Sequence, residues 1–127
     1  MSYFTDPAGP TTNVLDVGVF QELLESLTHA ATVAAIYRKF LENATGFIGE
    51  LRDQDVAART ETFHTLKGSA AMLGANRMAA LAATLQEQGA AVQVAAATEQ
   101  LTDELEKFRE AVASKLLAVG ASLDTPR

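Results

Sequence analysis

Proline is confined to the two ends of this 127-residue chain, at positions 7, 10 and 126. Between these positions no residue interrupts a helix by lacking a backbone N–H or by clashing with the preceding turn. Alanine, the strongest helix former, is abundant. No stretch of convincing length alternates apolar and polar residues with the β-branched and aromatic enrichment typical of a strand. The chain is therefore predicted to be all-α.

Apolar residues recur at helical spacing in five segments, which glycines or capping residues separate. The first segment is capped by Asp16 and broken at Thr28, and the second carries one apolar stripe from Val33 to Leu51. The third segment runs from a cap at Asp53 or Asp55 to Gly74, and the fourth from Asn76 to Gly89. The fifth carries apolar residues from Leu101 onward and stops at Gly120. The residues expected on the buried side of the third segment are Val56, Phe63, Leu66, Ala70 and Leu73. The buried stripe of the fifth segment is expected to run from Leu101 to Val119.

Long helical segments with short connections pack as antiparallel neighbours. The four longer segments are predicted to form an antiparallel up-down-up-down four-helix bundle over residues 13–120, with the short first helix capping one end. Residues 1–12 and 121–127 are expected to be flexible tails. The heptad-like spacing is also compatible with a coiled-coil dimer. Four amphipathic segments separated by glycines and caps favour an intramolecular bundle, and hence a monomer.

Composition and charge exclude several functions. The net charge of −6 disfavours nucleic-acid binding, which needs a basic face. No apolar run approaches the ~20 residues of a membrane span. Residues 1–10 lack the basic region and apolar core of a secretory signal, so none is expected there. The chain has no cysteine, which fits a cytoplasmic location. With only two histidines and no metal-ligand spacing, it is expected to bind no metal or other cofactor.

The third segment carries the unusual chemistry. A rotation of 100° per residue places His64 roughly 130° away from the core direction, on the solvent side. Gly68, one turn later, points almost opposite to the core. Lys67 lies at the flank, where its ammonium group can reach the neighbourhood of the imidazole. The segment therefore presents an exposed histidine with a cation nearby and no side chain at the fourth residue after it.

Each of these three residues suits phosphoryl transfer. A neutral imidazole is a good nucleophile near pH 7 and can carry a phosphoryl group on nitrogen. The Lys67 ammonium would offset the charge of that group. Glycine within a helix costs about 1 kcal/mol relative to alanine. Gly68 faces away from the bundle, so close packing against a neighbouring helix does not explain why a glycine stands there. Room for a second protein beside His64 does explain it.

The segment from His64 to Gly74 resembles the H-x-x-K-G-x-x-x-x-x-G signature of histidine phosphotransfer (HPt) domains. The resemblance extends over about residues 16–120, and Leu81 and Leu85 also fit the spacing of the family. The family usually has an acidic residue directly after the position of Leu85, where this chain has Gln86. That position is expected to lie outside the transfer chemistry.

The resemblance implies that His64 takes a phosphoryl group from an aspartyl phosphate on a receiver domain and passes it to the aspartate of another receiver. Lys67 would stabilise the phosphoryl group, and Gly68 would give the receiver access. The partners would be receivers of response regulators or of a hybrid sensor histidine kinase. Mg²⁺ would belong to the receiver's own pocket. The chain would be a carrier with no ATP site and no autophosphorylation, and hence not an enzyme.

Residues around His64 are expected to form the docking surface for the receiver. These residues are Ala57, Thr60, Glu61, Ala71 and Met72. Arg59 and Arg77 are candidates for contact with the acidic rim of a receiver. The acidic residues Asp103, Glu104, Glu106 and Glu110 are expected to form a solvated face. His29 has neither the lysine nor the glycine that follows His64 and is expected to be an ordinary residue at a helix junction.

Two other functions remain open at this stage. The chain could be a non-catalytic adaptor or dimerisation module, with His64 as a bystander. It could also be the dimerising histidine domain of a sensor kinase, in which an acidic residue typically follows the histidine and a proline lies nearby. Thr65 follows here, and the bundle contains no proline.

Overall fold

The computed structural model describes residues 13–124. Within this range the chain forms five α-helices and two short 3₁₀ turns, and it has no strand. The helices are α1 (Val17–Leu27), α2 (Ala30–Glu50), α3 (Val56–Met72), α4 (Asn76–Gln88) and α5 (Val94–Ala118), and the turns are η2 (Leu51–Asp53) and η3 (Gly89–Ala91). None of the helices among residues 13–124 is both long and apolar enough to cross a membrane.

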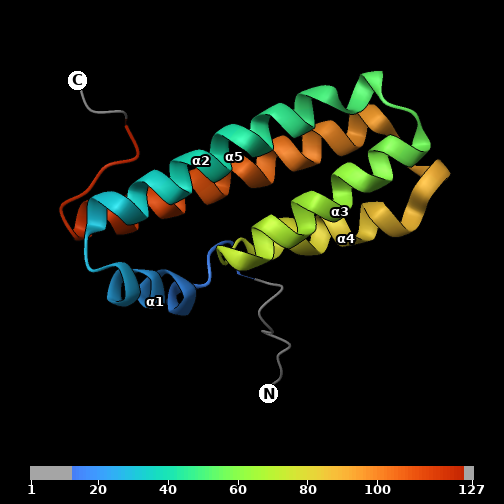
Figure 1. Cartoon of the computed structure of the whole chain (residues 1–127). Helices are drawn as coiled ribbons and strands as arrows, with labels where there is room; N and C mark the ends of the chain where they lie inside the picture. The colour runs from blue at the N-terminus through green and yellow to red at the C-terminus, as the bar shows by residue number, and fades with distance from the viewer. Residues whose placement is uncertain (1–12, 125–127) are drawn as a thin grey trace, which may run out of the picture.

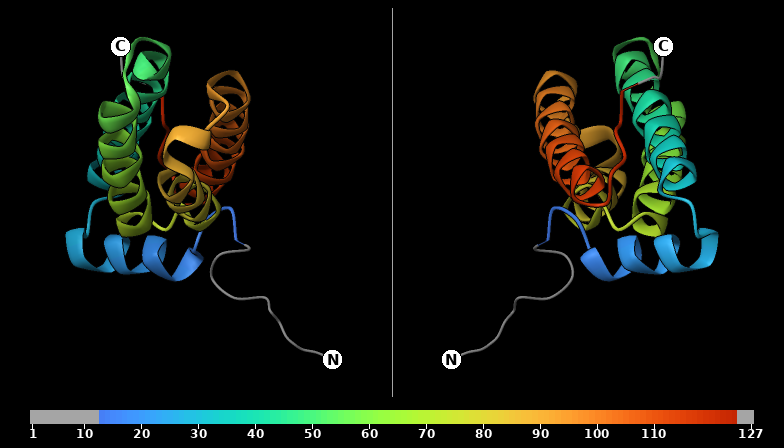
Figure 2. Two further views of the ribbon diagram at one scale, coloured as in Figure 1. Left: turned by 90° about the vertical axis from the view of Figure 1, so that its right-hand side faces the viewer. Right: turned by 90° about the vertical axis from the view of Figure 1, so that its left-hand side faces the viewer.

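The four longer helices run alternately up and down, with α2 beside α5 and α3 beside α4 (Figure 1). The short helix α1 lies across one end of the bundle (Figure 1 and Figure 2). The predicted all-α architecture with a capping helix is therefore confirmed. The expected tails at residues 1–12 and 125–127 lie outside the described range.

The capping residues predicted for α1 and α3 are used as expected, whereas α2 and α5 begin before the first apolar residues of their predicted stripes. The Asp16 carboxylate accepts the backbone N–H of Gly18 at 2.9 Å and caps α1. α1 ends at Thr28, whose φ of 62° is left-handed. Of the two candidate caps of α3, Asp55 is the one used, since its carboxylate accepts the N–H of Ala58 at 2.8 Å.

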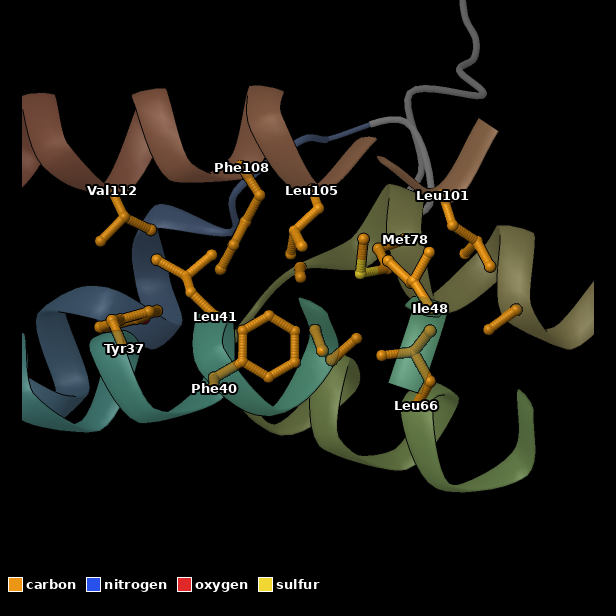
Figure 3. Close-up of a cluster of buried hydrophobic side chains, with 14 of the residues drawn as sticks. Tyr37, Phe40, Leu41, Ile48, Leu66, Met78, Leu101, Leu105, Phe108 and Val112 are labelled. Atoms are coloured by element: carbon orange, nitrogen blue, oxygen red, sulfur yellow. The ribbon is translucent and has the colours of Figure 1, made fainter. Parts of the chain in front are cut away.

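Side chains from α2, α3, α4 and α5 meet in one apolar core (Figure 3). The rings of Phe40 and Phe108 pack edge to face with their centres 5.6 Å apart, and Tyr37 lies 5.9 Å from Phe108. The Tyr37 hydroxyl donates a hydrogen bond of 3.0 Å to the Leu73 carbonyl at the end of α3. Burial, and secondarily the nearby Asp16 charge, raises the pKa of Tyr37 to about 12.

Two residues assigned to the core lie at its edge instead. Val56 is 40% exposed and Val119 is 43% exposed. Val56 is the first residue of α3, and Val119 follows the last residue of α5. The periodic pattern continues through both positions, but there the helices have reached the ends of the bundle and have no neighbour to cover them.

The chain after α5 differs from the expected loose tail. Ala121 and Leu123 are partly buried against the core. The Arg38 guanidinium of α2 donates hydrogen bonds to three successive carbonyl oxygens, at 3.3 Å to Ser122, 2.8 Å to Leu123 and 3.3 Å to Asp124. Residues 121–124, part of the expected flexible tail, therefore pack against the bundle, and the domain limits stay a prediction.

Candidate functional site

α3 separates a buried side from an exposed side. Phe63, Leu66 and Ala70 are buried in the core, whereas His64 and Gly68 are exposed. The predicted orientation of the helix is therefore confirmed. The imidazole lies on a helix that the core holds from behind, and it is accessible from solvent.

Gly68 leaves open space one turn after His64. A Cβ atom built at this position would meet no heavy atom within 4 Å beyond the backbone of its own helix and its chain neighbours. No neighbouring helix therefore approaches α3 at this point. The glycine keeps the surface beside the imidazole low, which suits the approach of another protein.

Gln86 on α4 contacts the imidazole directly. Its side-chain amide nitrogen lies 3.3 Å from Nδ1 of His64. An amide has both a donor and an acceptor end, and the two ends are exchanged by a half-turn of the side chain, so the amide can partner either tautomer of the ring. The sequence predicts this position outside the transfer chemistry, yet its side chain is in direct contact with the imidazole. The contact leaves Nε2 as the ring nitrogen that Gln86 does not engage.

Lys67 is the cation that this surface offers. It is half-buried on α3 and, among residues 13–124, has no hydrogen-bond or ion-pair partner for its ammonium group. The other cations of α3 and α4 are engaged. Arg59 donates to the Gln54 carbonyl, and Arg77 lies 2.8 Å from a carboxylate oxygen of Glu104.

Comparison with known families decides the identity of the bundle. The family model described as Hpt domain matches residues 19–111, a range that includes His64, Lys67, Gly68 and Gln86. The chain belongs to the Hpt domain family. Hpt domains are phosphocarriers that act with receiver domains in phosphorelays. Searches of curated proteins and of solved structures gave no match.

The two arginines considered for receiver contact serve the fold of this Hpt domain. The Arg77 ion pair joins α4 to α5, and its partner Glu104 is only 14% exposed. Glu104 therefore does not belong to a solvated acidic face, although Asp103, Glu106 and Glu110 are exposed as expected. Helical periodicity does not predict this ion pair, because it joins side chains of two different helices.

The predicted docking residues of the Hpt domain lie on the outer side of α3. Ala57, Glu61, Ala71 and Met72 are exposed, and the hydroxyl of half-buried Thr60 donates to the Val56 carbonyl. Met72 is 78% exposed, the largest value among the exposed large hydrophobic residues of the described chain. The geometry brings these residues onto one surface with His64, and their docking role stays a prediction.

Gln86 is the site residue that sequence reasoning missed. A signal for it exists in the spacing, because His64 lies eleven residues before Ala75 and Gln86 lies eleven residues after it. Ala75 joins α3 to α4, which are antiparallel. Residues equally distant from such a turn lie side by side. Among residues 13–124 no group of histidine and carboxylate side chains could hold a metal ion.

Proposed function

We propose that this Hpt domain shuttles a phosphoryl group between the aspartates of receiver domains through a phosphohistidine at His64. The observation that carries the proposal is the exposed imidazole, held at Nδ1 by Gln86, with open space beside it at Gly68. Receivers of response regulators, or of a hybrid sensor histidine kinase, are the proposed partners. We also place the exchange in the cytoplasm, which the cysteine-free sequence favours.

Nε2 of His64 is the proposed nucleophile. With the Gln86 amide oxygen turned toward the ring, Nδ1 donates its hydrogen to Gln86, and Nε2 keeps a free electron pair. That pair attacks the phosphorus of a receiver aspartyl phosphate. The N–P bond forms as the P–O bond to aspartate breaks, and the carboxylate leaves with the electrons of that bond. The reverse sequence passes the group to a second receiver.

Lys67 is proposed to offset the charge of the phosphoryl group. Lys67 follows His64 by about one turn of α3, and its ammonium has no competing partner among the described residues. A fixed cation beside a developing negative charge stabilises the transition state and the phosphorylated product. Mg²⁺ is expected to come with the receiver's acidic pocket, so the proposed chemistry requires none from this chain.

Gly68 and the residues around it are proposed to admit the receiver. Ala57, Thr60 and Ala71 are small, so they keep the surface low beside the imidazole. Glu61 and Met72 extend this surface toward the two ends of α3. Together they would let the acidic pocket of a receiver reach Nε2 without displacing a helix.

Transfer of label from a phosphorylated receiver tests the proposal. Wild-type protein should acquire a phosphoryl group that is stable in alkali and labile in acid. His64→Gln should fold normally, because the side chain is exposed, and should take no label. His29→Gln is the matched control, since His29 is also exposed but lies outside α3, and it should be labelled like the wild type.

The adaptor function predicts a different result. Receivers would bind the wild type and His64→Gln with equal affinity, and neither protein would be labelled by any receiver of the source organism. That outcome would overturn the phosphotransfer proposal. Labelling of His64→Gln at the wild-type level would also overturn it.

A further inference from the structure

Met72 places an oxidisable sulfur on the outside of α3. The residue is 78% exposed, whereas Met78, the other methionine among residues 13–124, is 1% exposed on α4. Peroxides oxidise a methionine thioether to a sulfoxide, and they reach an exposed sulfur sooner than a buried one. The chain has no cysteine, the side chain that otherwise reacts first with such oxidants. A small oxidant therefore reaches Met72 well before Met78.

Met72 lies on the same side of α3 as Gly68. The two residues are four apart within the helix, which places them about 40° apart around its axis. His64 precedes Met72 by eight residues, or about 12 Å along the helix. A protein interface of ordinary size covers about 800 Å² on each partner, a patch extending roughly 16 Å from its centre. A receiver centred on His64 therefore also covers Met72.

The surroundings of Met72 suit an oxidised side chain. Met72 lines an open hollow of about 250 Å³ between α2 and α3, and Asn43 and Ser69 are polar residues that line the same hollow. Their amide and hydroxyl groups are hydrogen-bond donors. A thioether sulfur is a weak acceptor, whereas a sulfoxide is polar and carries an acceptor oxygen. Oxidation therefore gives Met72 a use for donors that the thioether leaves unused.

We propose that Met72 is an oxidation-sensitive residue of the docking surface, and that its sulfoxide weakens the binding of receivers. The inference rests on the proposed function and adds a means of regulating it. The oxidant is a peroxide. A lone pair of the sulfur attacks one peroxide oxygen, the S–O bond forms as the O–O bond breaks, and the second oxygen takes up the proton and leaves as water. Two electrons pass from the sulfur to the peroxide.

The sulfoxide acts on docking and leaves the reacting atoms unchanged. A receiver that covers Met72 removes the surrounding water, and a sulfoxide loses its hydration there unless the receiver supplies a donor. The thioether has little hydration to lose. The imidazole of His64 is separated from Met72 by two turns of helix, so its nucleophilic nitrogen is not altered by the oxidation.

Peroxide treatment followed by mass spectrometry tests the selectivity. The full chain is treated with hydrogen peroxide, the reaction is stopped with catalase, and the protein is digested. The peptide that contains Met72 should gain one oxygen atom at least about tenfold faster than the peptide that contains Met78. Circular dichroism of the oxidised protein should match that of the untreated protein, because Met72 lies outside the core.

Receiver binding tests the consequence, with the peroxide removed before the receiver is added. Oxidation should raise the Kd of the wild type for a cognate receiver by about three- to tenfold. The matched control is Met72→Leu, which keeps an apolar side chain and the other methionines but has no sulfur at this position. Its Kd should be the same before and after treatment. Methionine sulfoxide reductases that act on both epimers should restore the wild-type Kd.

Three outcomes would overturn the oxidation proposal. They are equal rates of oxidation at Met72 and Met78, an unchanged Kd in the oxidised wild type, and an equal loss of affinity in treated Met72→Leu. Labelling of His64 by phosphoramidate, a small donor that needs no docking, should stay within about twofold after oxidation. If neither phosphoramidate nor any receiver labels the untreated wild type, the proposed function fails instead. Oxidation rates and receiver binding are measured without label, so the two failures are distinguishable.

Discussion

Gly68 and Gly74 lie six residues apart in the same sequence motif, yet their surroundings are opposite. Gly68 is helical and exposed, and an added Cβ would meet no atom within 4 Å apart from its chain neighbours and the backbone of its own helix. Gly74 is buried and has a φ of +80°, and an added Cβ would lie 3.1 Å from both Cβ and the carbonyl oxygen of Asp16. The Gly74 carbonyl also accepts the N–H of Asp16 at 2.7 Å.

The two glycines of this motif meet different requirements, one for the turn between two helices and one for access to His64. At Gly74 the missing side chain lets the chain turn from α3 toward α4 and lets the start of α1 pack on that turn. At Gly68 the fold has no need of a glycine, and a larger residue would fit without a clash inside the molecule. Gly68 is therefore expected to matter for phosphoryl transfer, and Gly74 for folding.

Gly74→Ala should give the largest loss of stability. A non-glycine residue at this φ is strained, and the added methyl group presses on the backbone of Asp16, so we expect a loss of about 2–5 kcal/mol. Urea unfolding followed by circular dichroism measures it. Phosphoryl transfer by the fraction that remains folded should be close to normal. Unchanged stability would mean that α1 shifts without cost, and the contrast with Gly68 would disappear.

Gly68→Gln should slow transfer from a receiver by about tenfold or more, because its side chain would occupy the space beside the imidazole. The free energy of unfolding should stay constant or rise slightly, since glutamine is a better helix former than glycine. Gly49→Gln is the matched control: Gly49 is also exposed and helical, but it lies on the α2–α5 side. Equal transfer rates in Gly68→Gln and wild type would remove the steric role of Gly68.

Tyr37→Phe examines the junction before Gly74, because the Tyr37 hydroxyl bonds to the Leu73 carbonyl. Loss of this hydrogen bond should cost about 1 kcal/mol at pH 7. The pKa of Tyr37 is raised to about 12 in the folded protein, above its ordinary value of 10. The folded state therefore holds this proton more tightly than the unfolded chain does, and the resulting stability is lost as the pH rises from 10 toward 12.

The measurement for Tyr37 is urea unfolding of wild type and Tyr37→Phe at several pH values between 7 and 12. The difference between the two proteins cancels the titration of lysines and of the other tyrosine. Wild type should lose more stability than the variant above pH 10. Parallel curves for the two proteins would show that the hydroxyl ionises equally easily in the folded and unfolded states.

Gly68→Ala should have the smallest effect. It should stabilise the protein by up to about 1 kcal/mol through helix propensity alone. Gly46→Ala is the matched comparison, since Gly46 is another exposed glycine within a helix with nothing within 4 Å of an added Cβ. The two gains should agree. A loss of stability at Gly68 alone would mean that its surroundings are less open than the structure indicates.

The features that could be predicted from sequence depend on local patterns. The caps at Asp16 and Asp55 and the exposed side of α3 follow from residue types and helical spacing within a few turns. The contacts of Gln86 with His64 and of Arg77 with Glu104 join different helices, so no local pattern identifies them. Val56 fits the apolar period of α3, but it lies beyond the part of α3 that a neighbouring helix covers, so it is exposed.

The hydrogen bonds from Arg38 hold residues 122–124 against the bundle. These residues lie beside α2 and α5, whereas His64 faces outward from α3 and meets α4. A fluorescent dye or an immobilising tag joined after residue 124 would thus start on a different side of the bundle from the imidazole. Receiver-binding assays can attach the protein there without obstructing the surface that they measure.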